Sequence, residues 1–189
     1  MKSLEHISFS QNAERIAALY NEGEDSLLLG MLGQEYTIRH SGFVLHGQRA
    51  PESHAQVLLD YLLSSGSVLQ EMPWRSFGEL AGESSPSFRQ RVEAPLAASA
   101  TEIVARANAI LPMLDARRAP SIIGSDLALN VRALPKVSLH VELAQETQEF
   151  PAEAWVLFSN NAHEFMPLPG LQSLAEIFKD RLLSLLRIY

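Results

Sequence analysis

Apolar residues recur at intervals of three and four along five segments of the chain, the spacing that places them on one face of an α-helix. Four of these segments are preceded by a serine or threonine whose side chain is expected to cap the helix. These residues are Ser10, Ser53, Ser85 and Thr101. The predicted helices run from residue 11 to about 20, from 54 to about 64, from 86 to about 96, from 102 to about 114, and from about 170 to 187. Pro95 is expected to end or kink the third helix, because proline removes a helical hydrogen bond.

Between the first and second helices the pattern changes to that of β-structure, over Leu27–Leu32 and Gln34–Gln48. A two-residue hairpin loop at Ser41-Gly42 places residue 40 opposite 43 and residue 38 opposite 45. The residues that this register gathers on one apolar face are Tyr36, Ile38, Phe43 and Leu45.

The last third of the chain returns to strands, LALNVRA at 127–133 and VSLHVEL at 137–143. A three-residue connection, 134–136, pairs 133 with 137 and 131 with 139, so that both apolar sets share one face. AWVLF, at 154–158, is apolar on both faces, as a central strand should be. These elements predict an α+β fold: a mostly antiparallel sheet packed by several helices, with an N-terminal hairpin and a long C-terminal amphipathic helix. We expect a single domain over residues 1–189.

Composition narrows the partners and the compartment. The 47% hydrophobic and 20% charged content is typical of a folded protein, and the net charge of -7 argues against a nucleic-acid partner. No apolar run reaches the roughly 18 residues of a membrane helix, and the N-terminal residues lack the apolar segment of a signal peptide. With no cysteine, the chain offers no thiolate ligand for a metal or cluster. We therefore expect a cytoplasmic protein with no membrane partner.

No catalytic motif is recognised. His163-Glu164 is not the start of a zinc-protease HExxH motif, because residue 167 is proline. The chain has no GxSxG nucleophile elbow, phosphate-binding loop or dinucleotide fingerprint. His140 and Glu142 share one face of a strand, which is expected to be the solvated polar face of an antiparallel sheet. The sequence therefore disfavours an enzyme and predicts neither catalytic residues nor a metal site.

Two segments are richer in polar and aromatic residues than a connection requires. The first segment, residues 74–80, can anchor a loop on the core or line a pocket. The second follows the strand that ends at Phe158, where ligands collect in many α/β-containing folds, although asparagine also suits a tight structural corner. The candidate ligand-binding residues are Trp74, Ser76, Phe77, Glu79, Asn160, Asn161, His163 and Glu164.

An ordered set of segments resembles a known family. The segments are LGQEYTI, HAQVLLDYLL, WRSFGELAG, FRQRVEAPL, LPKVSLHVEL, EFPAEAWVLFSNNAHEFMP and the closing helix. Together they resemble the bacterial and archaeal domain of unknown function family 3786, over residues from about 27 to 183. In that family an arginine usually stands at the position of Gly78, and an aspartate often stands at Ser159 or Asn160. The resemblance implies occurrence in anaerobes, with some members fused to corrinoid-type iron–sulfur domains.

Three functions remain open at this point. The favoured one is a non-catalytic accessory module that binds a small molecule or a metalloprotein partner, which the resemblance links to corrinoid or one-carbon metabolism. The cofactor is unknown, and a corrinoid is suggested by the family association alone. An enzyme built from His163, Glu164, Glu79 and Arg75 is one alternative. A scaffold for protein interaction or oligomerisation is the other, and the oligomeric state is not predicted.

Overall fold

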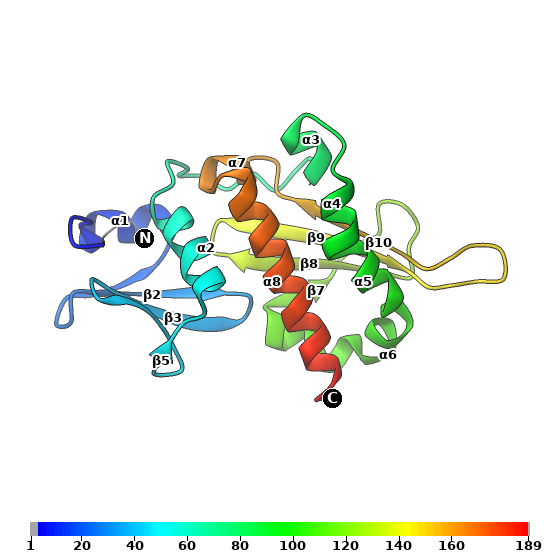
Figure 1. Cartoon of the computed structure of the whole chain (residues 1–189), viewed down its shortest axis with the longest axis horizontal. Helices are drawn as coiled ribbons and strands as arrows, with labels where there is room; N and C mark the ends of the chain where they lie inside the picture. Colours follow the sequence, from blue (N-terminus) through cyan, green and yellow to red (C-terminus); the bar gives the residue numbers. More distant parts are fainter. Residues whose placement is uncertain (1–3, 189) are drawn as a thin grey trace.

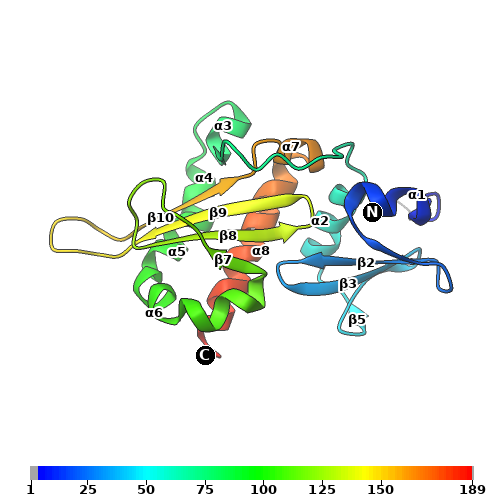
Figure 2. The same cartoon turned by 180° about the vertical axis from the view of Figure 1, so that it is seen from behind.

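The computed structural model describes residues 4–188 and contains two antiparallel sheets of five strands each (Figures 1 and 2). The first sheet is a meander of consecutive strands: β1 (Leu19–Asn21), β2 (Ser26–Met31), β3 (Gln34–Arg39), β4 (Gly42–Leu45) and β5 (Gln48–Arg49). The second sheet has the spatial order β6 (Arg75–Ser76), β10 (Glu153–Phe158), β9 (Val137–Ala144), β8 (Leu127–Leu134) and β7 (Ala116–Arg118). The predicted α+β fold and its N-terminal hairpin are confirmed.

The helices are α1 (Phe9–Ile16), α2 (Glu52–Leu62), α3 (Phe77–Ala81), α4 (Pro86–Phe88), η1 (Arg89–Glu93), α5 (Ala94–Ala98), α6 (Ala100–Ile110), η2 (Leu111–Leu114), α7 (Ala162–Phe165) and α8 (Leu168–Leu186). Helix α1 packs against β1 and β2 of the first sheet, and most of the others pack on one face of the second sheet. The long C-terminal helix α8 crosses the sheet, with α2 beside it toward the first sheet (Figure 1). Within residues 4–188, none of the helices combines the length and the apolar character needed to cross a membrane.

The N-terminal helix is shorter than predicted, and its cap is a different serine. It begins after Ser8, and it ends at Ile16 because Ala17 adopts the left-handed conformation. The backbone amides of Ala17 and Ala18 then donate to carbonyls of the last helical turn. Tyr20, predicted to lie on this helix, lies instead in β1. Side-chain spacing located the helix, but the reversal of the backbone set its end.

Pro95 does not end its helix. The helical path continues from α4 through η1 into α5, which ends at Ala98, and η1 is a π-helical stretch that ends two residues before Pro95. A proline cannot donate to the carbonyl four residues earlier and its ring crowds that turn. Widening the preceding turns into a π-helix accommodates both effects without breaking the helix.

The strand registers differ slightly from the predictions, but the faces are correct. Ile38 pairs with Phe43 instead of residue 45, a shift of two positions that leaves the four apolar side chains on one face. In β8 and β9, Val131 pairs with Leu139 as predicted, but a register irregularity follows and Leu134 pairs with Val137. The turn is therefore two residues long, and the bulge restores the apolar alignment.

Tyr61 ties three elements together inside the core. Its hydroxyl donates to the carbonyl oxygen of Ile16 at 2.9 Å and accepts from the backbone amide of Lys136 at 3.1 Å. The side chain is fully buried, and burial raises the pKa of the phenol well above its usual value. This hydroxyl on α2 is thus the hydrogen-bond partner of a carbonyl at the end of α1 and of an amide in the β8–β9 turn.

Removing this hydroxyl should cost measurable stability. We expect Tyr61→Phe to lower the free energy of unfolding by about 2 kcal/mol, because a buried carbonyl and a partly buried amide both lose their partner. Urea denaturation followed by circular dichroism measures this change. Tyr20→Phe, which removes a hydroxyl bonded to exposed Asp25, is the matched control and should change stability by less than about 0.5 kcal/mol. Equal effects of the two substitutions would contradict the assigned role.

Candidate functional site

The tryptophan segment and the corner after β10 meet at one cleft. They are adjacent because β6 pairs with the last two residues of β10, Ser76 with Leu157 and Arg75 with Phe158. The cleft, which we call the β10-end cleft, has a volume of about 240 Å³ and is lined by Gln70, Arg75, Glu79, Leu80, Asn160, Asn161, His163 and Glu164. Five of the eight predicted ligand-binding residues therefore line a single concave surface, and Trp74, Ser76 and Phe77 do not.

Asn161 holds the corner in place. Its side-chain oxygen accepts from the backbone amide of Gln70 at 2.9 Å, and its side-chain nitrogen donates to the carbonyl of Val68 at 2.8 Å and to Glu164 at 3.0 Å. The residue is buried, with 4% of its surface exposed. Asn161 therefore fastens the segment before β6 to the start of α7, and its side chain is fully engaged within the protein.

Other groups in the cleft are free. The side chains of Asn160 and His163 make no hydrogen bond to the residues between 4 and 188. The Arg75 Nε atom is buried and has no hydrogen-bond partner, alone among the buried side-chain nitrogens and oxygens of the described chain. Its nearest carboxylate oxygen, on Glu79, lies 3.9 Å away, which is too far for a hydrogen bond.

The side chain of Glu79 is hydrogen-bonded at the start of α3. One of its oxygens accepts from the backbone amide of Ser76 at 2.7 Å and from the Ser76 hydroxyl at 2.9 Å, while that hydroxyl accepts from the Glu79 amide. These bonds form a capping box at the start of α3. The backbone amide and the hydroxyl of Ser76 hold the pKa of Glu79 below its usual value. Glu79 is therefore a carboxylate at neutral pH.

The three remaining predicted residues have other environments. Ser76 is the cap of α3. Phe77 is 7% exposed and stacks on Phe88, with ring centroids 4.6 Å apart, so it anchors α3 to the core. Trp74 stacks on His140 with centroids 5.2 Å apart. The tryptophan thus covers the face of the second sheet that lies opposite the helices.

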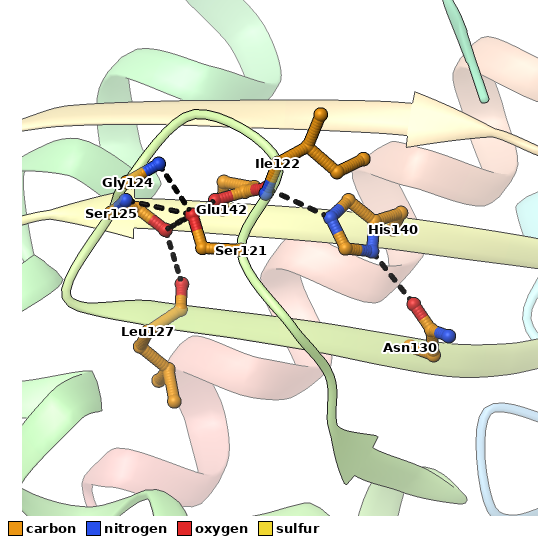
Figure 3. A network of polar contacts seen from close by, with 8 residues as sticks. All are labelled: Ser121, Ile122, Gly124, Ser125, Leu127, Asn130, His140 and Glu142. Carbon is orange, nitrogen blue, oxygen red and sulfur yellow. Dashed lines mark hydrogen bonds and ion pairs between the residues drawn. The ribbon is translucent and has the colours of Figure 1, made fainter.

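That face carries a buried polar network, which contradicts the predicted solvated surface. His140 and Glu142 are 2% and 1% exposed. His140 Nε2 lies 2.9 Å from Glu142, and its Nδ1 lies 2.7 Å from the side-chain oxygen of Asn130 (Figure 3). The segment 119–126, which joins β7 to β8 and which we call the covering loop, and Trp74 together exclude water from both side chains.

A single carboxylate holds the covering loop. Glu142 accepts hydrogen bonds from the hydroxyl of Ser121 at 2.5 Å, from the backbone amide of Ile122 at 2.6 Å, and from the hydroxyl of Ser125 (Figure 3). Burial raises the pKa of Glu142, but these three bonds and the bond to His140 outweigh it and lower the pKa to about 2. The group is therefore a fixed anion that anchors a loop.

The sequence carried only a weak signal for this network. VSLHVEL alternates as a half-solvated strand does, and the alternation does not reveal that a loop crosses the polar side. The SIIGSD segment predicts a turn, because serine and glycine favour turns, but it does not show that its serines face Glu142. In the described residues 4–188, no three His, Asp or Glu side chains are grouped to hold a metal ion.

The fold and cleft define an α+β protein with two antiparallel meander-like sheets and a polar cleft at one sheet edge. The chain belongs to the family described as Domain of unknown function (DUF3786), whose model matches residues 8–181. The predicted family region of about 27–183 is thereby confirmed in its main part, and it extends toward the N-terminus to include α1. Comparisons with curated proteins and with solved structures gave no match.

Proposed function

We propose that this protein is a non-catalytic binding module that holds a small organic anion in the β10-end cleft. The observation that carries the proposal is the Arg75 guanidinium, which lines the cleft. Its side chain is 38% exposed, and its buried Nε has no partner in the described chain. A buried donor left unpaired costs about 1–3 kcal/mol, so such donors in native proteins are usually satisfied by water, an ion or a ligand. A carboxylate is the acceptor that a guanidinium binds best.

The other free groups suit the same ligand. The amide of Asn160 and the imidazole of His163 line the cleft without internal partners, so they can bind the polar groups that accompany a carboxylate. Glu79 and Glu164 lie in the same cleft and disfavour a multiply charged anion. A molecule with one carboxylate and one or two neutral polar groups fits this balance of charge.

The size of the cleft sets a limit on the ligand. The volume of about 240 Å³ lies below the roughly 300–1,000 Å³ of pockets for drug-sized ligands, so the cleft suits a small ligand. A corrinoid is several times larger and cannot be enclosed there. The link to corrinoid or one-carbon metabolism that the family resemblance implies would then concern a metalloprotein partner of the module.

The acidic groups of the cleft support binding over proton transfer. Glu79 is engaged by Ser76 and its lowered pKa makes it a weak base at neutral pH. Glu164 already accepts from the Asn161 side chain. An enzyme built on these carboxylates would first have to release them from structural bonds.

A thermal-shift screen tests the proposal. The probes are acetate, lactate and benzoate, each paired with its neutral amide. A carboxylate that binds is expected to raise the melting temperature by about 5–10 °C at a hundredfold excess over its dissociation constant, and the paired amide should not. Calorimetric titration then measures the dissociation constant of each compound that shifts the melt.

Variants place the binding in the cleft. Arg75→Gln should abolish the shift. Arg89→Gln should retain it, because Arg89 lies outside the cleft and its side chain is 73% exposed. Shifts of equal size from carboxylates and amides, or a shift that persists in Arg75→Gln, would contradict the proposed ligand and site. Turnover of any bound carboxylate, followed by mass spectrometry, would overturn the non-catalytic assignment.

A further inference from the structure

The outer edge of β10 is only partly covered by another strand. β6 pairs with residues 157 and 158 of β10 and then turns into α3. Residues 153–156 have β9 on their inner side and no strand on the outer side within the described structure. An open strand edge presents unpaired amides and carbonyls, and it is a ready template for an added strand.

The alternation of the ladder identifies the backbone groups on this open edge. The amide of Val156 donates outward, to the side chain of Glu93 at 3.1 Å, so it does not face β9. In an antiparallel pair, residues two apart point the same way, so the amide and carbonyl of Ala154 also face outward. Val156 and Ala154 therefore carry the edge groups, while Trp155 bonds inward to β9. The Val156 amide is capped by Glu93, and the amide and carbonyl of Ala154 have no partner among the described residues.

A groove of about 520 Å³ runs along this edge. On one side it is walled by η1 and α5, and on the other by residues 151–155. The small side chains that line it are Ala94, Ala97, Ala98, Ala152 and Ala154. Because methyl groups project little, the helix and the strand edge leave a channel beside the outward backbone groups of Ala154.

The groove carries an acidic group at its strand side. Glu93 accepts from Val156 through one oxygen, and its other oxygen has no hydrogen-bond partner among residues 4–188. Burial raises the pKa of Glu93, because its charge is poorly solvated. At the rim, Glu153 lies 3.6 Å from Arg89, which neutralises that pair. The charge left for an occupant to meet is therefore the carboxylate of Glu93.

We propose that this groove is a docking site for an extended peptide segment of a partner protein, which adds to the edge of β10 at Ala154 and presents a lysine or arginine to Glu93. The added segment continues the line that β6 begins on the same edge, so the sheet already accepts a strand there. The alanines leave room for its apolar side chains, and the net charge of -7 favours a basic segment. This site is independent of the β10-end cleft.

The test uses a phage-displayed library of random octapeptides selected on the full chain. Enriched sequences are expected to alternate apolar residues around a basic one. Synthetic copies are then titrated by fluorescence anisotropy, with N-methyl groups on either the odd or the even residues. Strand addition uses the amides of alternate residues, so one methylation pattern should weaken binding at least about tenfold and the other should not.

Protein variants locate the site. Ala98→Trp, an exposed groove position, should weaken binding at least about tenfold by filling the channel, while Ala105→Trp, an exposed alanine on α6 outside the groove, should not. Glu93→Gln should remove the preference for a basic residue. Equal sensitivity to both methylation patterns, or no peptide that distinguishes the wild type from Ala98→Trp, overturns the proposal. So does a concentration-dependent dimer in light scattering that Ala98→Trp abolishes, because the occupant would then be a second copy.

Discussion

Replacing Gly33 with alanine is expected to lower the free energy of unfolding by about 4 kcal/mol. Gly33 forms the β2–β3 turn with Leu32, and both have positive φ. A β-carbon at Gly33 would lie 2.4 Å from the carbonyl oxygen of Met113 and 3.0 Å from the amide of Asp115. Both are backbone atoms of the η2 region, so relief requires moving the hairpin away from the second sheet. Left-handed strain of about 1–2 kcal/mol adds to an overpacking cost of about 1–3 kcal/mol.

The β2–β3 turn is hydrogen-bonded to the second sheet and to α8, so the expected loss of stability comes from this contact. The amide of Leu32 donates to the carbonyl of Ala133, and Arg181 of α8 donates to the carbonyls of Leu32 and Met113 at 2.8 Å each. Displacing the turn breaks these bonds together. Burial also lowers the pKa of Arg181, which remains charged at neutral pH.

Gly47→Ala is the matched control for this prediction. Gly47 has a φ of +76°, similar to that of Gly33, but a β-carbon there meets nothing within 4 Å. We expect it to cost about 1 kcal/mol, from backbone strain alone. Chemical denaturation of both variants gives the difference, which reports the contact with η2. If the two substitutions cost the same, the close approach of the sheets at Gly33 is wrong.

The second large effect concerns Glu142, whose removal should release the covering loop. We expect Glu142→Gln to lower the free energy of unfolding by about 3 kcal/mol at pH 7. The pKa of the group falls from 4.5 to about 2 on folding, and a shift of that size corresponds to about 3 kcal/mol. A glutamine also offers one acceptor oxygen where the carboxylate offers two to Ser121, Ile122 and Ser125.

The same shift predicts an acid dependence with a definite sign. A depressed pKa stabilises the folded state above the unfolded value of 4.5, and this stabilisation is lost as the pH falls toward 2. Wild-type stability should therefore decline between about pH 5 and pH 2, and Glu142→Gln should decline less over that window. Urea midpoints measured across this range test the slope, with Glu149→Gln in the exposed β9–β10 connection as control. Parallel slopes for Glu142→Gln and the wild type would contradict the anchoring role.

Hydrogen exchange gives an independent view of the loop. In Glu142→Gln, the amides of Ile122, Gly124 and Ser125 should exchange faster, because the first donates to Glu142 and the other two donate to the hydroxyl of Ser121. Amides of β9 should keep their protection. Faster exchange across the whole second sheet would instead indicate global destabilisation.

The candidate site was predicted in part, because some of its residues are placed by their position along the chain and others only by the pairing of distant strands. Asn160, His163 and Glu164 follow a strand directly, so their place at a strand end can be read from the chain. Glu79 could be placed beside them only through the pairing of β6 with β10, which joins residues about 80 positions apart. The burial of the Arg75 Nε atom and its lack of a partner depend on the tertiary structure and could not be read from the chain.

The sequence alone predicted the type and order of the long elements and the faces on which their apolar residues lie. Ile38 and Phe43 share a face, and Val131 lies opposite Leu139, because the pleat alternates strictly every residue. Tertiary structure alone decided which polar faces meet water. His140 and Glu142 are buried because the covering loop and Trp74 lie over them, and the edge of β10 stays open because β6 is two residues long. The physical reason is range: periodicity acts between neighbours along the chain, whereas burial depends on segments that come together only after folding.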